Sequence, residues 1–167
     1  RLTDRASAAS GAFDPAALLQ TLDAHGVAFV VIGGVAAILQ GAPLTTGDLD
    51  ICYERSTPNL EALGRALRSL DARLRGVEAG LPFQLDARTL RLGDSFTFAT
   101  SAGDLDCLGT PSGTGGYADL VTKAIEMELV GIRVRLASVD DLIRMKRAAN
   151  RLKDREQLRV LGARRDE

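Results

Sequence analysis

"VIGGVAAILQGAPLTTGDLDIC", from Val31 to Cys52, is the stretch of sequence that decides the fold. Its first residues end an apolar, β-branched run that predicts a buried strand. Its last residues alternate strictly between polar and apolar, as a strand with one buried face does. We expect four consecutive features here: a strand over Val27–Ile32, a Gly33-Gly34 turn, a short helix over Val35–Gln40, and a strand over Asp48–Tyr53.

The second strand carries two carboxylates that point the same way. Side chains alternate between the faces of a strand, so Asp48 and Asp50 share one face while Leu49 and Ile51 enter the core. Two carboxylates at this spacing repel each other, and a hard divalent cation such as Mg²⁺ removes that penalty. A lone D-x-D also occurs in surface turns, where both carboxylates are simply solvated.

The two glycines strengthen the case for a ligand site. Glycine lets a ligand approach the backbone closely, and a helix that starts there offers free N–H groups to phosphate. We therefore expect Gly33 and Gly34 to form a phosphate cradle beside a metal site at Asp48 and Asp50. The alternative is a plain tight turn next to two solvated carboxylates.

The rest of the chain alternates helices and strands without clean βαβ units. This pattern predicts an α+β fold, a mixed sheet with helices packed mainly on one side. We expect residues 1–13 to be a flexible segment and residues 14–167 to form a single domain with basic C-terminal helices. The expected elements are a helix from Asp14-Pro15 to His25-Gly26, a helix from Thr57, short strands within 83–108, a helix over Tyr117–Val130, a strand over Ile132–Leu136, a helix from Ser138 and a last helix after Leu152.

Charge is distributed unevenly along the chain. Residues 144–167 carry nine Lys/Arg and four Asp/Glu, whereas the whole chain has a net charge of −1. The basic segment is therefore either a surface for phosphates or an ordinary solvated helix face.

Composition excludes several other classes. No apolar run is long enough for a membrane span, and two cysteines, Cys52 and Cys107, do not make a disulfide scaffold. We expect a cytoplasmic protein without a Cys52–Cys107 disulfide, because the two side chains should face opposite sides of the sheet. His25, the one histidine, reads as a helix-end residue and not as a metal ligand.

The segment from Val31 to Cys52 resembles the signature of the DNA polymerase β-like nucleotidyltransferase superfamily, in which a glycine-rich turn precedes a D-h-D-h strand. Among its members the chain is most similar to minimal nucleotidyltransferases of the AbiEii/MenT toxin type. Many members have Ser where Gly34 stands, so we expect its phosphate contact to come from backbone N–H groups or from Thr45 or Thr46.

The resemblance implies a third carboxylate on a later strand, and "GDLDCLG", from Gly103 to Gly109, is the candidate. Asp104 and Asp106 share a face there. Asp106, between Leu105 and Cys107, best matches the family's pattern and would be a metal ligand or general base. Asp104 remains an alternative, as does a strand that simply has a wet face.

The C-terminal block "SVDDLIRMKRAANRLKD", from Ser138 to Asp154, resembles the ending of the same toxin-type enzymes. The resemblance gives Lys146 and Asp154 the roles of completing the site, with Arg151 as a phosphate helper. Lys146 also falls on the apolar stripe of the expected helix, where it would either meet an anion or extend its ammonium to the edge.

Together these features predict an enzyme that transfers a nucleoside monophosphate from an NTP to an acceptor hydroxyl, with two Mg²⁺ ions, or Mn²⁺ in their place. The resemblance further implies the 3′ end of tRNA as acceptor and a toxin role with a cognate antitoxin protein. The alternatives are a small-molecule acceptor of the aminoglycoside kind, a protein acceptor, or a module that binds nucleotide without catalysis.

Overall fold

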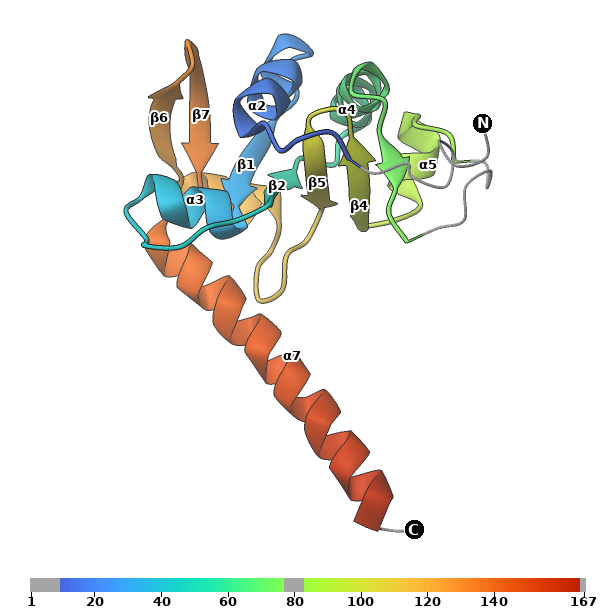
Figure 1. Cartoon of the computed structure of the whole chain (residues 1–167), viewed down its shortest axis with the longest axis vertical. Helices are drawn as coiled ribbons and strands as arrows, with labels where there is room; N and C mark the ends of the chain where they lie inside the picture. Colours follow the sequence, from blue (N-terminus) through green and yellow to red (C-terminus); the bar gives the residue numbers. More distant parts are fainter. Residues whose placement is uncertain (1–9, 77–82, 166–167) are drawn as a thin grey trace.

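The computed structural model describes residues 10–76 and 83–165 of the chain (Figure 1). Its elements follow in this order: α2 (Pro15–Ala24), β1 (Phe29–Ile32), α3 (Gly33–Leu39), β2 (Asp48–Tyr53), α4 (Thr57–Ser69), β3 (Arg73–Leu74), α5 (Ala87–Arg91), β4 (Ser95–Thr100), β5 (Gly103–Leu108), α6 (Tyr117–Leu120), the 3-10 helix η1 (Val121–Lys123), β6 (Ile125–Leu129), β7 (Ile132–Leu136) and α7 (Val139–Arg165).

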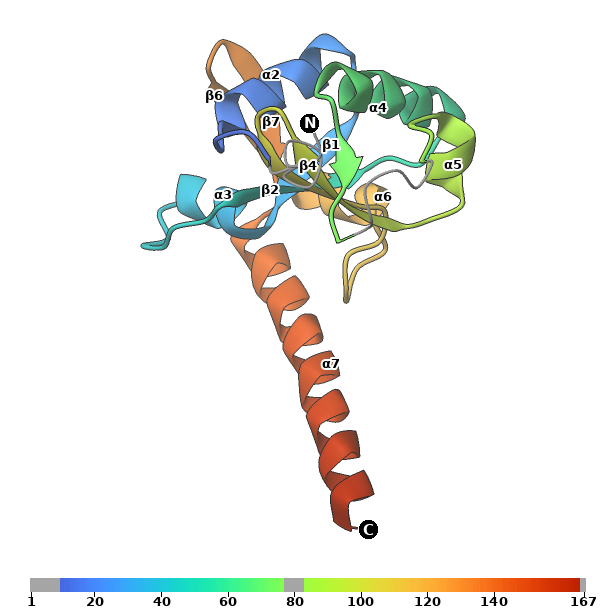
Figure 2. The ribbon, with the colours of Figure 1, turned by 45° about the vertical axis from the view of Figure 1, so that its right-hand side comes forward.

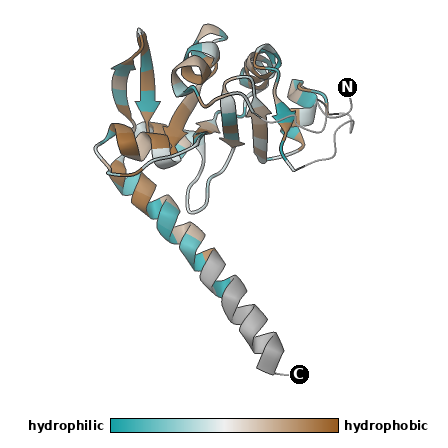
Figure 3. Cartoon of the chain, in the orientation of Figure 1, coloured by the Kyte–Doolittle hydropathy of each residue, from teal (hydrophilic) through white to brown (hydrophobic). Residues whose placement is uncertain are grey.

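All the strands join one mixed sheet in the order β3-β4-β5-β2-β1-β7-β6. The pairs β2–β5 and β1–β7 are parallel, and the remaining neighbours are antiparallel. The β1–α3–β2 unit therefore lies at the centre of the sheet, as the Val31–Cys52 stretch predicts. β1 is buried on both faces and is apolar along its length (Figure 3).

The helices divide unequally between the two faces. α2 and α4 lie side by side over one face and bury the main core, which includes Leu22, Ile51, Leu63 and Leu105 (Figures 1 and 2). A much smaller cluster lies on the other face, under α6 and the first turns of α7. It consists of Val30, Ile32, Cys52, Leu120 and Ala137. The predicted fold class, a mixed sheet with helices mainly on one side, is confirmed.

The predicted ends of the first helix, at Asp14 and His25, are confirmed. The Asp14 carboxylate caps α2 by accepting a hydrogen bond of 3.1 Å from the Ala17 N–H, and His25 stands at the C-terminal end of the same helix. Residues 10–14 are attached to the β4–β5 turn, because the N–H groups of Gly11 and Asp14 donate to the carbonyl groups of Thr100 and Ala102.

The predicted helix over Tyr117–Val130 is wrong. The helix ends after α6 and η1, and Ile125–Leu129 is the edge strand β6. Val130 and Gly131, with φ of +46° and +80°, turn the chain into an antiparallel hairpin with β7. Cross-strand pairs, such as Arg133 with Glu126 at 3.2 Å, add to the hairpin, and pairing across it overrides the helical pattern.

The two predicted C-terminal helices form a single helix, α7, which runs away from the body (Figures 1 and 2). Between Ser138 and Leu161 the sequence contains no glycine or proline, so nothing interrupts the hydrogen-bonded ladder at Leu152. The first turns of α7 contact the sheet through Leu142 and Met145. Within the described part of the chain, no helix combines the length and the apolar character that crossing a membrane requires.

Candidate metal centre and active site

Parallel pairing of β2 with β5 places two identical Asp-Leu-Asp segments in register. Asp48 lies opposite Asp104, and Asp50 lies opposite Asp106. The alternation of each strand turns all four carboxylates to the face of the smaller cluster, since Leu49 and its counterpart on β5 enter the main core. Four carboxylates from two strands thus share one small area.

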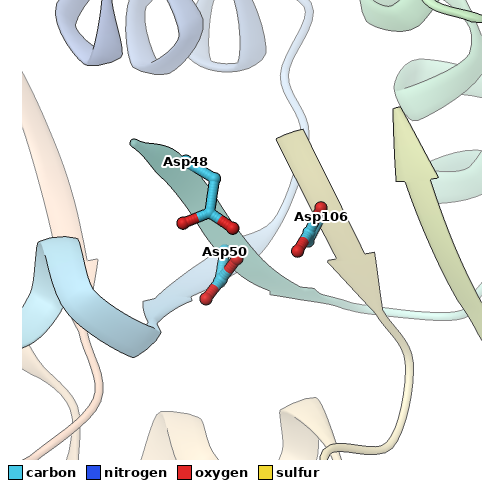
Figure 4. A group of neighbouring side chains, drawn as sticks. All are labelled: Asp48, Asp50 and Asp106. Carbon is cyan, nitrogen blue, oxygen red and sulfur yellow. The ribbon is translucent and has the colours of Figure 1, made fainter. Parts of the chain in front are cut away.

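Three of these four carboxylates converge. One oxygen each of Asp48, Asp50 and Asp106 lies within 4.8 Å of the other two, an arrangement that could hold a metal ion (Figure 4). Within residues 10–76 and 83–165 this is the one such group. Asp106, and not Asp104, is therefore the β5 carboxylate that joins the pair on β2. A set of carboxylate oxygens with no nitrogen or sulfur suits a hard cation such as Mg²⁺ or Mn²⁺.

Asp50 is the carboxylate that most needs a cation. Burial, together with the neighbouring charges of Asp48 and Asp106, raises its pKa from 3.8 to about 7. Its Oδ1 is buried without a hydrogen-bond partner in the described structure. A buried carboxylate beside two others is costly when ionised, and a bound divalent cation reverses that cost. The three residues therefore fit a divalent metal.

Gly33 makes room for Asp50. It has φ of +67°, and a Cβ at this position would overlap Oδ2 of Asp50. The glycine is therefore required by the carboxylate as well as by the backbone. The role predicted for it, phosphate binding, stays a prediction.

Gly34 packs against the side chain of Thr46. A Cβ on Gly34 would lie 2.9 Å from Cβ of Thr46, so the threonine side chain fills the space that a larger residue at position 34 would take. The Thr46 hydroxyl donates to Oδ1 of Asp48 at 3.0 Å. Thr46 is thus half-buried next to the carboxylates, whereas Thr45 is exposed.

Arg75, which follows β3, is the residue that sequence reasoning missed. Its Nη1 lies 2.7 Å from Oδ2 of Asp104, and its Nη2 contacts Oδ1 of Asp106. Burial opposes ionisation of Asp104, but hydrogen bonds from Ser10 and Arg75 hold its pKa below the ordinary value. No local motif marks Arg75, because its contacts depend on the β3–β4–β5 pairing.

The predicted residues of α7 are not brought to the triad by any contact in the described structure. Lys146 and Arg151 are exposed, and Lys146 makes no ion pair with other described residues. The packed side of the helix is that of Leu142 and Met145, so Lys146 lies at its edge and not on it. The side chain of Asp154 lies outside the described part of the structure. The roles of these three residues stay predictions.

An ion-pair network of Arg144, Asp141 and Asp119, in which only Asp141 is buried, anchors the base of α7. Arg144 bridges Asp141 of its own helix, at 3.1 Å, and Asp119 of α6, at 2.9 Å. Asp119 in turn accepts a hydrogen bond of 2.9 Å from the Gly115 N–H. The loop after β5 and the start of α7 are therefore joined on the face that carries the carboxylates.

The two cysteines lie on opposite faces of the sheet. Cys107 packs in the main core and Cys52 in the smaller cluster, and both thiols are free. Burial raises the pKa of the Cys52 thiol to about 12. The expectation that the two residues form no disulfide is confirmed.

Comparison with known proteins identifies the fold. The structure superposes on a crystal structure described as a "putative nucleotidyltransferase" from Thermotoga maritima, with a TM-score of 0.62 and 15% sequence identity. The match covers 92% of this chain and 97% of the other. No protein-family model matches the sequence, and no curated protein matches it either. The chain has a nucleotidyltransferase fold, and its carboxylate triad could hold a divalent metal ion.

Proposed function

We propose that this protein is a metal-dependent nucleotidyltransferase. The observation that carries the proposal is the convergence of Asp48, Asp50 and Asp106 on one face of the sheet, within 4.8 Å of one another, in a nucleotidyltransferase fold. An acceptor hydroxyl would attack the α-phosphorus of an NTP. A new O–P bond forms, the bond to the bridging oxygen breaks, and pyrophosphate leaves.

Each residue of the site has a task in this reaction. Asp48, Asp50 and Asp106 would hold the metal, with Mg²⁺ as the expected ion and two ions as the expected number. Bound Mg²⁺ lowers the pKa of an attacking hydroxyl and offsets the charge that develops on pyrophosphate. The alternative role for Asp106 is that of the general base, which would take the hydroxyl proton.

The triphosphate would be held on the two sides of the triad. Gly33 and Gly34 would offer backbone N–H groups, and the hydroxyl groups of Thr45 and Thr46 would add contacts. Lys146 and Arg151 would pair with phosphate oxygens from α7, and Asp154 would complete the site. The support for this cationic pair is its exposure on the helix whose first turns pack on the same face of the sheet as the triad.

We propose tRNA as the acceptor, at its 3′ end, and a toxin role in the cytoplasm opposed by an antitoxin protein. The support is the net positive charge of residues 144–167 on an otherwise acidic chain, and the extension of α7 beyond the body (Figure 2). Phosphate contacts are the sequence-independent part of RNA binding, so a basic projecting helix suits them.

The decisive experiment is a transfer screen. Each α-labelled NTP is incubated with the protein and Mg²⁺ in the presence of total tRNA, aminoglycosides or total protein, and labelled product is counted. Asp50→Asn is the matched control. Label on tRNA from the wild type alone supports the proposal, and label on a small molecule or protein moves the acceptor. A thermal shift with NTP but no transfer would indicate a nucleotide-binding module without catalysis.

A salt series tests the RNA surface directly. Affinity for tRNA should fall by roughly one log unit per log unit of salt for each phosphate neutralised. Replacing Arg159, Arg164 and Arg165 with Ala should flatten this slope. The matched control replaces three exposed arginines of the body, Arg65, Arg73 and Arg88, and should leave the slope unchanged. Equal slopes for both triple variants would exclude the α7 arginines as the RNA surface.

A further inference from the structure

Arg75 connects the two carboxylates of β5. Its planar guanidinium reaches Asp104 through Nη1, at 2.7 Å, and Asp106 through Nη2, so one side chain spans both residues. The Arg75 side chain is only 29% exposed, which limits how far solvent competes for it. A planar fork of this kind fixes the direction of the groups it binds, which a flexible ammonium does less well.

The contact uses one oxygen of Asp106 and leaves the other free. Arg75 holds Oδ1, and one oxygen of Asp106 points toward Asp50 (Figure 4). The last torsion of an aspartate side chain is broad, so a carboxylate needs a second contact to keep one orientation. In metal sites, the partners of the ligands supply that contact.

Asp104 in turn is held from both sides. Ser10 donates a hydrogen bond to its Oδ1, and Arg75 occupies its Oδ2. The segment that carries Ser10 is fixed, because the Gly11 N–H donates to the Thr100 carbonyl at 2.8 Å. Ser10, Asp104, Arg75 and Asp106 therefore form a continuous chain of contacts that ends at the triad.

We propose that Arg75 is a positioning residue, anchored by Asp104, which holds one oxygen of Asp106 so that the other faces the metal held by Asp48 and Asp50. This inference rests on the proposed function, since it assigns Asp106 to the metal. It gives the two carboxylates of β5 different tasks: Asp106 binds the cation, and Asp104 holds the arginine.

A purely electrostatic role for Arg75 predicts the opposite result for metal binding. Arg75 is a positive charge near a cation site and repels the metal. If long-range electrostatics alone mattered, removing Arg75 would therefore strengthen metal binding. Positioning predicts weaker binding, because the freed Asp106 carboxylate rotates away from its useful orientation. The sign of the change therefore separates the two roles.

The experiment measures Mn²⁺ binding by electron paramagnetic resonance titration of the full chain without nucleotide. The variants are Arg75→Ala, Arg75→Lys, Asp104→Asn and the double variant Arg75→Ala with Asp104→Asn. Arg73→Ala is the matched control, because Arg73 lies two residues away on β3, is exposed and, among the described residues, pairs with Asp71 alone, at 3.4 Å. Circular dichroism melting checks that each variant folds.

Arg75→Ala, Arg75→Lys and Asp104→Asn should each weaken Mn²⁺ binding. For Arg75→Ala the loss of affinity should be about 10-fold or more. The double variant should be no weaker than Arg75→Ala, since Asp104 acts through the arginine. In the transfer assay Arg75→Ala should lower kcat and change the KM for NTP by no more than about twofold. Arg73→Ala should behave as the wild type in both assays.

Three results would overturn the inference. Tighter Mn²⁺ binding by Arg75→Ala, with a double variant that returns to the wild-type value, would indicate electrostatics alone. A raised KM with unchanged kcat would make Arg75 a nucleotide-binding residue. Absence of Mn²⁺ binding by the wild type would overturn the metal site of the proposed function as well. This result is seen in the wild type, so it is distinguishable from the first two, which are seen in the Arg75 variants.

Discussion

The same tripeptide, Asp-Leu-Asp, occurs on β2 and on β5, but different groups contact the carboxylates of the two copies. On β5, the protein supplies its own cation, Arg75, which contacts Asp104 and Asp106. On β2, the contacts are a hydroxyl, from Thr46 to Asp48, and the space left by Gly33 beside Asp50. The copy that lacks a protein cation supplies two of the three carboxylates of the metal triad, Asp48 and Asp50, and the β5 copy supplies one, Asp106.

A D-x-D motif is therefore not a metal site by itself. Both copies have the same spacing, alternation and strand context, and their register makes them direct neighbours. What differs is which groups the rest of the fold brings to each. The following experiments test how far the division between the copies extends.

The largest expected effect is a loss of kcat, and it differs between matched substitutions in the Asp-Leu-Asp segments of β2 and β5. Asp50→Asn should lower kcat by more than about 10³-fold, because loss of a metal ligand removes several kcal/mol of transition-state stabilisation. Asp104→Asn, the same change on β5, should cost only about 10–100-fold, as expected for a partner of a ligand. Steady-state transfer assays of both variants measure this. Equal losses would mean that the two segments share one role.

The next effect concerns the space beside Asp50. Gly33→Ala should lower activity by about 10²-fold, because the new methyl group displaces the Asp50 carboxylate. Gly26→Ala is the matched control, since Gly26 has a similar φ of +73° but nothing within 4 Å of an added Cβ. Both variants should lose roughly 1–3 kcal/mol of stability through backbone strain. Unchanged activity of Gly33→Ala would show that Asp50 does not need this space.

The buried Asp50 of β2 should also make the stability of the folded protein depend on pH. Because the pKa of Asp50 rises to about 7 on folding, from 3.8, the folded protein keeps a proton that the unfolded chain loses between these pH values. Stability of the metal-free protein should therefore fall as pH rises from about 4 to about 7, and the penalty is complete above pH 7.

Asp50→Asn removes that penalty and should stabilise the metal-free protein at pH 8 by roughly 1–3 kcal/mol. Saturating Mg²⁺ should stabilise the wild type at pH 8, by about 2.7 kcal/mol at 100 times its dissociation constant, and the variant much less. Urea unfolding from pH 4 to pH 8, with and without Mg²⁺, measures both effects. A metal-free wild type that becomes more stable across this range would contradict the assignment of Asp50.

The smallest expected effect concerns α7. Lys146→Ala should raise the KM for NTP about threefold to tenfold through loss of a charged phosphate contact, with little change in stability because the side chain is exposed. Arg147→Ala, the neighbouring exposed cation, is the matched control and should leave the KM unchanged. If both variants behave as the wild type, Lys146 is an ordinary surface lysine.

The parts of the site that depend on local sequence patterns could be predicted from the sequence. The strand, glycine turn, helix and D-x-D strand around Val31–Cys52 lie within one supersecondary unit, and periodicity predicts them in order. The facing of Asp104 and Asp106 follows from alternation alone. Their placement beside Asp48 and Asp50 does not, because it depends on the pairing of β2 with a strand far along the chain.

The errors and omissions have the same physical origin. Arg75 follows a two-residue strand whose importance comes entirely from its neighbour β4, and no periodicity can show that. The Tyr117–Val130 segment has residues compatible with a helix, but a hairpin with β7 determines its second half. Strand pairing distinguishes these outcomes, and the periodicity of a single sequence does not display it.

The register of β2 against β5 has a consequence for folding kinetics. Asp50 and Asp106 are 56 residues apart, and a parallel pair of this kind closes only after the intervening α4, β3, α5 and β4 have folded back on the sheet. Long loops must lose their entropy before such a contact forms, so it belongs to the late steps of folding. A metal that needs all three carboxylates therefore cannot act as a nucleus for folding. Its tight binding marks the moment at which β2 and β5 have paired.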